Sequence, residues 1–176
     1  MKYLFTIIIP IIMFNSCMEN MTQQNNEIIN GQYVEKNNDG LISVIGNFDN
    51  SKRDGHFIYF DNKGKLQAQE NYLNDLLHGQ QITIHNTGKI KNSINYKNGV
   101  KDGKYEKFYK TGKLQESGSF ANGLKHGEII WYYDNGEKNI IYNYKDGKLN
   151  GSATIFSKEG DIIEESIYQN GNKITD

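Results

Sequence analysis

Residues 103–126 read GKYEKFYKTGKLQESGSFANGLKH and form one of six consecutive copies of a unit 24 residues long. Glycine occupies the first position of every copy and again the tenth, without an insertion between copies. The first column is Gly31, Gly55, Gly79, Gly103, Gly127 and Gly151, and the second is Gly40, Gly64, Gly88, Gly112, Gly136 and Gly160. A fixed period of this length is the sequence signature of a repeat protein.

Each unit predicts two short strands. An aromatic and β-branched run follows the first glycine, and the glycine at position ten suits the left-handed residue that ends a three-residue hairpin loop. The dipeptides Asn98-Gly99, Asn122-Gly123 and Asn170-Gly171, with Asp146-Gly147, predict the turn that returns the chain to the next unit. The expected fold is therefore all-β, an elongated single-layer antiparallel meander. Its units span residues 31–54, 55–78, 79–102, 103–126, 127–150 and 151–174.

The apolar residues predict which positions share a face of this sheet. Strict alternation through a three-residue loop puts positions four, six, twelve and eighteen of each unit on one face. Twenty of these 24 positions are apolar or aromatic. The eighteenth position is always aromatic: Phe48, Tyr72, Tyr96, Phe120, Tyr144 and Tyr168. The opposite face is predicted to be more polar, with an asparagine column at Asn47, Asn71, Asn95 and Asn143, although it also carries several aromatic residues.

The N-terminus predicts an export signal. Lys2 precedes an apolar run from Tyr3 to Phe14, too short to span a bilayer as a helix. The run ends just before Cys17, the only cysteine, and the segment resembles a bacterial lipoprotein signal, which implies a lipid on Cys17 and a membrane anchor in the bacterial cell envelope. Residues 1–17 would then be the signal segment with its lipidation cysteine, and residues 18–30 a flexible tether. An ordinary cleaved signal peptide and a cytoplasmic chain with an apolar tail are the alternatives.

Neither composition nor motifs predict catalysis. The net charge of −1 leaves no basic field for nucleic acid. His78 and His126 hold the same position two units apart, too far to share a metal ion, and His56 and His85 occupy different columns. No phosphate-binding glycine motif or paired carboxylates occur, so we expect no enzyme activity, no metal and no cofactor.

The cleanest copy carries a family resemblance. Gly103, Tyr105, Phe108, Gly112 and Leu114, followed by Phe120-Ala-Asn-Gly123, resemble the variant MORN repeat of bacterial proteins. The resemblance covers residues 31–174 and implies an elongated single-layer sheet, with the first and sixth units drifting from the pattern as terminal caps do. Many similar chains carry the label of a YwqK-type toxin–antitoxin antitoxin. The resemblance therefore implies an antitoxin or immunity protein as one alternative function, and lipid-surface binding as another.

A single-layer sheet leaves its faces without a second layer, and this favours a binding function. The aromatic columns are either the sheet's own packing or, in part, a recognition surface covered by sheet coiling, by a second copy of the chain or by a partner. The hypothesis is a membrane-anchored interaction or scaffold module that binds a protein or peptide of unknown identity. We expect Tyr105, Tyr109, Trp131 and Tyr133 to be exposed aromatic contact residues. A structural spacer without a ligand is a further alternative.

Overall fold

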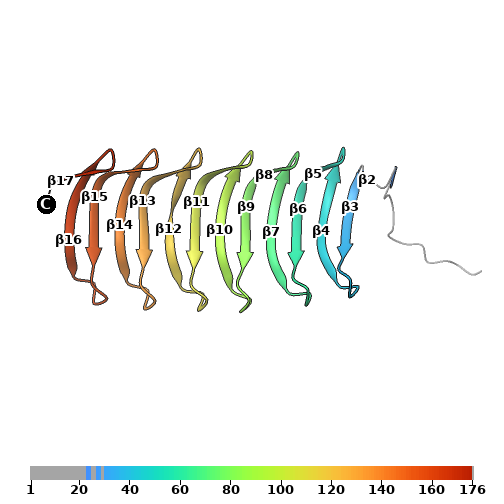
Figure 1. Ribbon diagram of the computed structural model, residues 1–176, viewed down its shortest axis with the longest axis horizontal. Helices are drawn as coiled ribbons and strands as arrows, with labels where there is room; N and C mark the ends of the chain where they lie inside the picture. Colours follow the sequence, from blue (N-terminus) through green and yellow to red (C-terminus); the bar gives the residue numbers. More distant parts are fainter. Residues whose placement is uncertain (1–22, 25–26, 29, 176) are drawn as a thin grey trace, which may run out of the picture.

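A computed structural model describes residues 23–24, 27–28 and 30–175, which form one open antiparallel sheet of fifteen strands and a separate two-stranded pair. Figure 1 shows the hairpins side by side along the long axis of the molecule. The described residues contain no helix, so none that could cross a membrane. The predicted all-β, single-layer meander is confirmed. Cys17 and the predicted signal segment lie outside the described residues.

The sheet consists of six hairpins in chain order. Their first strands are β3 (Gly31–Lys36), β6 (Gly55–Phe60), β9 (Gly79–Ile84), β11 (Val100–Phe108), β13 (Leu124–Tyr132) and β15 (Lys148–Phe156). Their second strands are β4 (Ile42–Asp49), β7 (Leu66–Leu73), β10 (Ile90–Lys97), β12 (Leu114–Ala121), β14 (Lys138–Lys145) and β16 (Ile162–Gln169). Three short strands border the return turns: β5 (Lys52–Arg53), β8 (Leu76–Leu77) and β17 (Asn172–Thr175). The isolated pair is β1 (Gln23–Gln24) with β2 (Glu27–Ile28).

The hairpin loops have the predicted geometry. In the second unit, Asp61 N donates to Lys65 O at 2.8 Å and Gly64 N donates to Asp61 O at 2.9 Å, enclosing a three-residue loop. Gly64 has φ +74°, and the glycines of this column in the other five units have φ between +79° and +103°. Residues with a Cβ are strained in this conformation, which explains why glycine fills the column.

The prediction of which residues share a face is wrong for position eighteen. Tyr59 pairs with Ala68 but Phe60 pairs with Leu66, so Gln67 is an extra residue on the second strand. The same β-bulge occurs at the equivalent place in all six hairpins. A bulge inserts one residue and shifts the alternation of side chains beyond it to the opposite face. Positions four, six and twelve therefore share one face, and the aromatic column at position eighteen lies on the other.

We call the two surfaces the packed face (positions 3, 5, 14, 16 and 18 of each unit) and the open face (positions 2, 4, 6, 12, 15 and 17). Every buried residue among residues 30–174 lies on the packed face. These are Gly46, Phe57, Ala68, Tyr72, Tyr105, Glu116, Ile129, Ala153 and Ser166. The packed face therefore combines first-strand positions that were predicted to lie on the more polar face with second-strand positions that were predicted to lie on the apolar face.

Side chains of complementary size meet where one unit packs against the next. Position 16 of each unit lies beside position three of the following unit, as in the pairing of Tyr142 with Ala153. Gly46 lies under the Phe57 ring, and Gly118 lies against Ile129. Gly46 and Gly118 are the two glycines outside the three periodic columns, and each makes room for a large neighbour.

The asparagine column links the units instead of facing water freely. The Nδ2 atoms of Asn71, Asn95 and Asn143 donate to the backbone oxygens of Gln80, Lys104 and Ser152, at 2.8, 2.7 and 3.1 Å. Each bond joins position 17 of one unit to position two of the next.

Candidate functional site

The predicted aromatic residues lie in two separate places. Tyr105 on β11 and Trp131 on β13 lie on the packed face, on either side of β12. Tyr109 and Tyr133 lie at the start of hairpin loops. The structure therefore does not gather all four in one exposed patch. Tyr105 is only 1 % exposed, so the expectation that it is an exposed contact residue is wrong.

Tyr109 and Tyr133 join neighbouring units. The Tyr109 hydroxyl donates to Tyr132 O at 2.6 Å, and the Tyr133 hydroxyl donates to Phe156 O at 2.8 Å. His85 occupies the same position of its unit, and its Nε2 lies 2.9 Å from Phe108 O. These side chains therefore have a structural contact that accounts for their position.

The centre of the packed face in unit four is the carboxylate of Glu116, which has three hydrogen-bond donors. The Tyr105 hydroxyl lies 2.6 Å from Oε1, Lys125 Nζ lies 2.9 Å from the same oxygen, and Lys107 Nζ lies 2.6 Å from Oε2. The Glu116 side chain is 6 % exposed, whereas those of Lys107 and Lys125 are 41 % and 28 % exposed. A buried carboxylate needs such partners because its desolvation is unfavourable.

The electrostatic balance at this site keeps Glu116 charged. Burial alone would raise the pKa of Glu116, but the hydrogen bonds from Lys107, Tyr105 and Lys125 outweigh burial and hold it below its usual value. Burial and the bond to Glu116 raise the pKa of Tyr105, so this hydroxyl stays protonated and keeps donating. The arrangement therefore keeps Glu116 as a charged acceptor and Tyr105 as a neutral donor.

Aromatic rings and cations border Glu116 on the side of unit five. Trp131 pairs across the strands with Glu116, and its ring contacts Tyr142 edge-to-face at a centroid distance of 5.6 Å. Lys125 Nζ lies 4.6 Å from the Trp131 ring and 5.4 Å from the Tyr144 ring. We define the Trp131 cluster as Glu116, Lys125, Trp131, Tyr142 and Tyr144.

Cations recur over the aromatic column at position eighteen. Arg53 and Lys101 occupy position 23 of their units, as Lys125 does. The Arg53 guanidinium lies 4.0 Å from the Tyr72 ring centre, and Lys101 Nζ lies 5.3 Å from that of Phe120. Cation–π pairs of this kind contribute roughly 0.5–2 kcal/mol each, depending on exposure.

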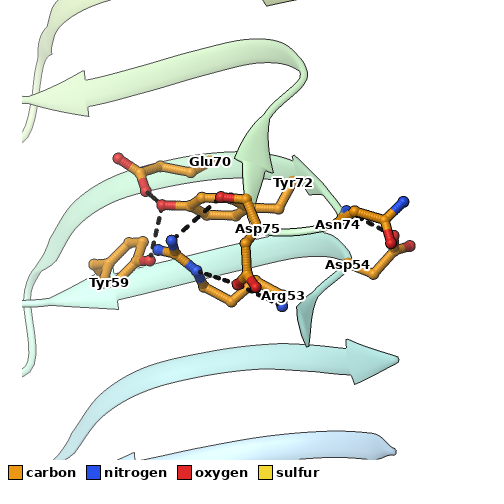
Figure 2. A network of polar contacts seen from close by, with 7 residues as sticks. All are labelled: Arg53, Asp54, Tyr59, Glu70, Tyr72, Asn74 and Asp75. Carbon is orange, nitrogen blue, oxygen red and sulfur yellow. Dashed lines mark hydrogen bonds and ion pairs between the residues drawn. The ribbon is translucent and has the colours of Figure 1, made fainter. Parts of the chain in front are cut away.

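A second polar network lies on the packed face of unit two. Figure 2 shows Arg53 between Asp75 and the rings of Tyr59 and Tyr72. Arg53 Nε lies 3.2 Å from Asp75 Oδ1, and the Tyr72 hydroxyl donates to Glu70. Burial and the bond to Glu70 raise the pKa of Tyr72, as burial and Glu116 do for Tyr105. The packed face thus holds two carboxylate-centred networks, two units apart.

Within the part of the chain that the structure describes, no three His, Cys, Asp or Glu side chains lie close enough together to hold a metal ion. Sequence reasoning missed Glu116, Lys107 and Lys125 because the bulge hides which residues face one another. Had the alternation been reversed after position twelve, Glu116 would have been recognised as a carboxylate on the same face as Tyr105.

The sequence model of the MORN repeat variant family matches four segments of this chain, residues 53–74, 77–98, 101–122 and 125–146. Together they make up half of the sequence and fall on units two to five. The chain belongs to the MORN repeat variant family. The first and sixth units, which drift from the repeat pattern, are outside the match.

Other comparisons add little to this family membership. No curated protein matches the sequence significantly. Among solved structures, the chain is similar to one described as "Crystal structure of GtfA/B complex bound to UDP and GlcNAc", with a TM-score of 0.26 and 11 % identity. The match covers 77 % of this chain and 24 % of the other, so this MORN repeat chain spans about a quarter of that protein.

Proposed function

We propose that this MORN repeat protein is a non-catalytic interaction module at the bacterial cell envelope, anchored by a lipid on Cys17, and that it binds a protein or peptide through the Trp131 cluster. The observation that carries the proposal is a partly exposed aromatic and cationic surface on a sheet without a second layer. Both faces of the fifteen-stranded sheet lack a covering layer in the described chain. Tryptophan and tyrosine are enriched in protein-binding surfaces and among the residues that contribute most to binding.

The chemistry of the cluster favours a peptide or protein partner over a small molecule. Trp131, Tyr142 and Tyr144 are half-buried; Trp131 contacts Tyr142, and Lys125 lies over the Trp131 and Tyr144 rings, so the three offer apolar area at a low entropic cost. Lys107 and Lys125 share the single negative charge of Glu116, so the network retains a net positive charge. A partner would therefore gain from apolar contact with the rings and from a negative charge placed beside them.

A matched pair of variants tests the proposed surface. Trp131→Ala removes the ring from the packed face, and Tyr132→Ala removes a neighbouring ring from the open face. Envelope proteins cross-linked to each full-length variant in intact cells would be quantified by mass spectrometry, with the circular dichroism of the sheet as a folding check. We expect Trp131→Ala to lose captured partners that Tyr132→Ala retains. Identical capture by the parent and both variants would refute the assignment.

The anchor has its own test. We expect a fatty-acid analogue to label the parent chain and not the Cys17→Ala variant, because Cys17 is the only cysteine. Labelling of both chains would refute a lipid at Cys17 while leaving the partner surface untouched.

A second candidate function is contact with a lipid surface along the return turns. Leu76, Val100 and Leu124 occupy the same position of successive units and are 49 %, 46 % and 49 % exposed. The chain enters the sheet at this edge, where β3 begins at Gly31. Changing all three residues to Ser should weaken co-sedimentation of residues 18–176 with phospholipid vesicles. Unchanged sedimentation would exclude this function.

A further inference from the structure

The two ends of the sheet are open edges whose strands could pair antiparallel with each other. At one end, no other strand among the described residues pairs with the outer side of β3, because β1 and β2 pair only with each other. At the other end, β17 pairs with Ile167, Tyr168 and Gln169 of β16, and no described strand pairs with the outer side of the segment Ile162–Ser166. Within the chain, every second strand equivalent to β16 pairs with the first strand of the following unit, which is equivalent to β3. The free edge of β16 would therefore fit β3 of a second copy of the chain.

All five internal junctions between units share one register. Position 14 of a unit pairs with position five of the next unit, and the pairs are Val44–Tyr59, Ala68–Thr83, Asn92–Lys107, Glu116–Trp131 and Ile140–Ile155. None of these pairs sets two like charges opposite each other. A second copy docked in the same register would place its Glu35 directly opposite Glu164.

We propose that Glu35 and Glu164 keep the sheet from binding a second copy end to end, so that the chain remains a single stack of six units. Like charges directly opposite on neighbouring strands are destabilising, and inward-pointing charges are a common protection of open sheet edges. Both side chains lie on the packed face, so in an end-to-end dimer the two carboxylates would be brought together there. The proposal does not depend on the binding function proposed above.

The two ends of the sheet also differ from the internal junctions in the side chains that link one unit to the next. Ile167 replaces the asparagine that links position 17 to the following unit through Asn71, Asn95 and Asn143. At the other end, Asn30 Oδ1 already accepts the backbone N–H of Asn50 at 2.6 Å. In units two, four and six, position 24 of the preceding unit accepts this N–H, as Asp102 does for Asn122 at 3.1 Å. The chain thus completes its first unit itself and provides fewer links from its last.

A carboxylate at position 14 can bind two cations at once, so a second cation supplied by another copy should turn repulsion at Glu164 into attraction. Glu116 binds both Lys107 and Lys125, whereas Glu164 binds Lys173 at 3.1 Å. The Glu35→Lys variant would set an ammonium group of one copy opposite Glu164 of the next. We expect its dissociation constant for self-association to be about tenfold lower than that of the parent. The association should be open-ended, because each added copy presents the same free edge.

The measurement is sedimentation equilibrium of the full chain in density-matched detergent micelles, over a range of protein concentrations. Three variants are compared with the parent: Glu35→Lys, Glu35→Lys with Glu164→Lys, and Glu106→Lys as a control. The control makes the same charge change on an internal strand, at an exposed residue of the open face. We expect concentration-dependent growth beyond a dimer for Glu35→Lys alone, and monomers for the parent, the control and the doubly changed chain.

Three results would overturn the proposal. One is a Glu35→Lys variant that stays as monomeric as the parent while its circular dichroism shows an intact sheet. Another is equal association of the single and the doubly changed variants, because the second change restores like charges at the junction. The third is a parent chain that already forms end-to-end polymers.

Discussion

The close packing around Gly46 allows a quantitative prediction of how the Gly46→Ala substitution affects stability. A Cβ added at Gly46 would lie 2.3 Å from Cε1 and 2.4 Å from Cδ1 of Phe57, whereas ordinary contact begins at 3.4 Å. In the Gly46→Ala variant the ring would therefore have to move by about 1.1 Å, the difference between 3.4 and 2.3 Å. The ring is 2 % exposed and is held edge-on by Phe48 and Tyr72, at centroid distances of 5.7 and 5.2 Å.

The cost of Gly46→Ala follows from these contacts. Overpacking a core position costs about 1–3 kcal/mol, and a rigid ring favours the upper end of that range. Replacing glycine within a strand returns about 0.5–1 kcal/mol of backbone entropy. We therefore expect a net loss of about 2 kcal/mol, which corresponds to about 30-fold faster hydrogen exchange where β4 meets β6. Exchange followed by mass spectrometry measures this locally, which matters because a terminal unit of a repeat protein can open alone.

Gly118→Ala is the matched comparison. Its Cβ would lie 2.2 Å from Cδ1 of Ile129, the end of a flexible side chain, and 3.2 and 3.3 Å from Cε1 of Tyr105 and the backbone oxygen of Glu128, where a shift of a few tenths of an ångström suffices. We expect a smaller loss of about 1 kcal/mol in this variant. Adding Phe57→Leu to Gly46→Ala should cost less than the sum of the two single changes. Equal exchange in the two alanine variants, or a Gly46→Ala variant indistinguishable from the parent, would show that the rigid ring is not the limiting contact.

Three further predictions concern the polar contacts, measured by urea unfolding with Trp131 fluorescence as the signal. Glu116→Gln should destabilise the sheet by about 1.5–3 kcal/mol at neutral pH, because hydrogen bonds to a charged group are lost. The pKa of Glu116 is lowered in the folded chain, so its contribution is complete above its unfolded pKa of about 4.3 and disappears as the pH falls through the folded pKa. The stability difference between parent and variant should therefore shrink in acid, and a difference independent of pH would contradict the assignment. Tyr109→Phe removes the bond to Tyr132 O and should cost about 0.5–1.5 kcal/mol, whereas an unchanged midpoint would show that this link is dispensable. Asn95→Ala leaves Lys104 O without its amide donor and should cost about 1 kcal/mol, a loss that Asn95→Asp should not restore because a carboxylate cannot donate.

The repeat, the hairpins and their loops could be predicted because each has a local chemical cause. Glycine at position ten is required by its positive φ, and the period of 24 residues places every loop. The bulge could not be predicted, because its extra residue has no common chemistry. It is Ser43, Gln67, Lys91, Gln115, Asn139 and Ile163 in the six units. Without the bulge, each aromatic residue at position eighteen is assigned to the wrong face.

The candidate site was predictable only in part, for the same reason. Trp131 was expected as a contact residue and lies on the packed face with partial exposure, but Tyr105 is buried against Glu116. The Glu116 network joins residues from three strands, and their contacts depend on the register after the bulge. Sequence spacing alone therefore identifies the aromatic residues of the candidate site but not Glu116, the carboxylate that binds several of its side chains.

Some positions of the repeat hold the same residue in several units and others do not, and this difference decides whether a partner can bind at a single place on the sheet. Asparagine occupies position 17 in four of the six units, and those of units two, three and five join each unit to the next. A partner that contacted only such repeating columns would find equivalent sites one unit apart, about 10 Å along the sheet at two strand spacings. The residue at position 5 of the packed face, by contrast, differs in every unit. Trp131 is the only tryptophan in the chain, and it pairs with the only buried carboxylate among residues 30–174. This pair occurs once, so a partner that requires it has a single register, which is the physical reason to place the binding surface there.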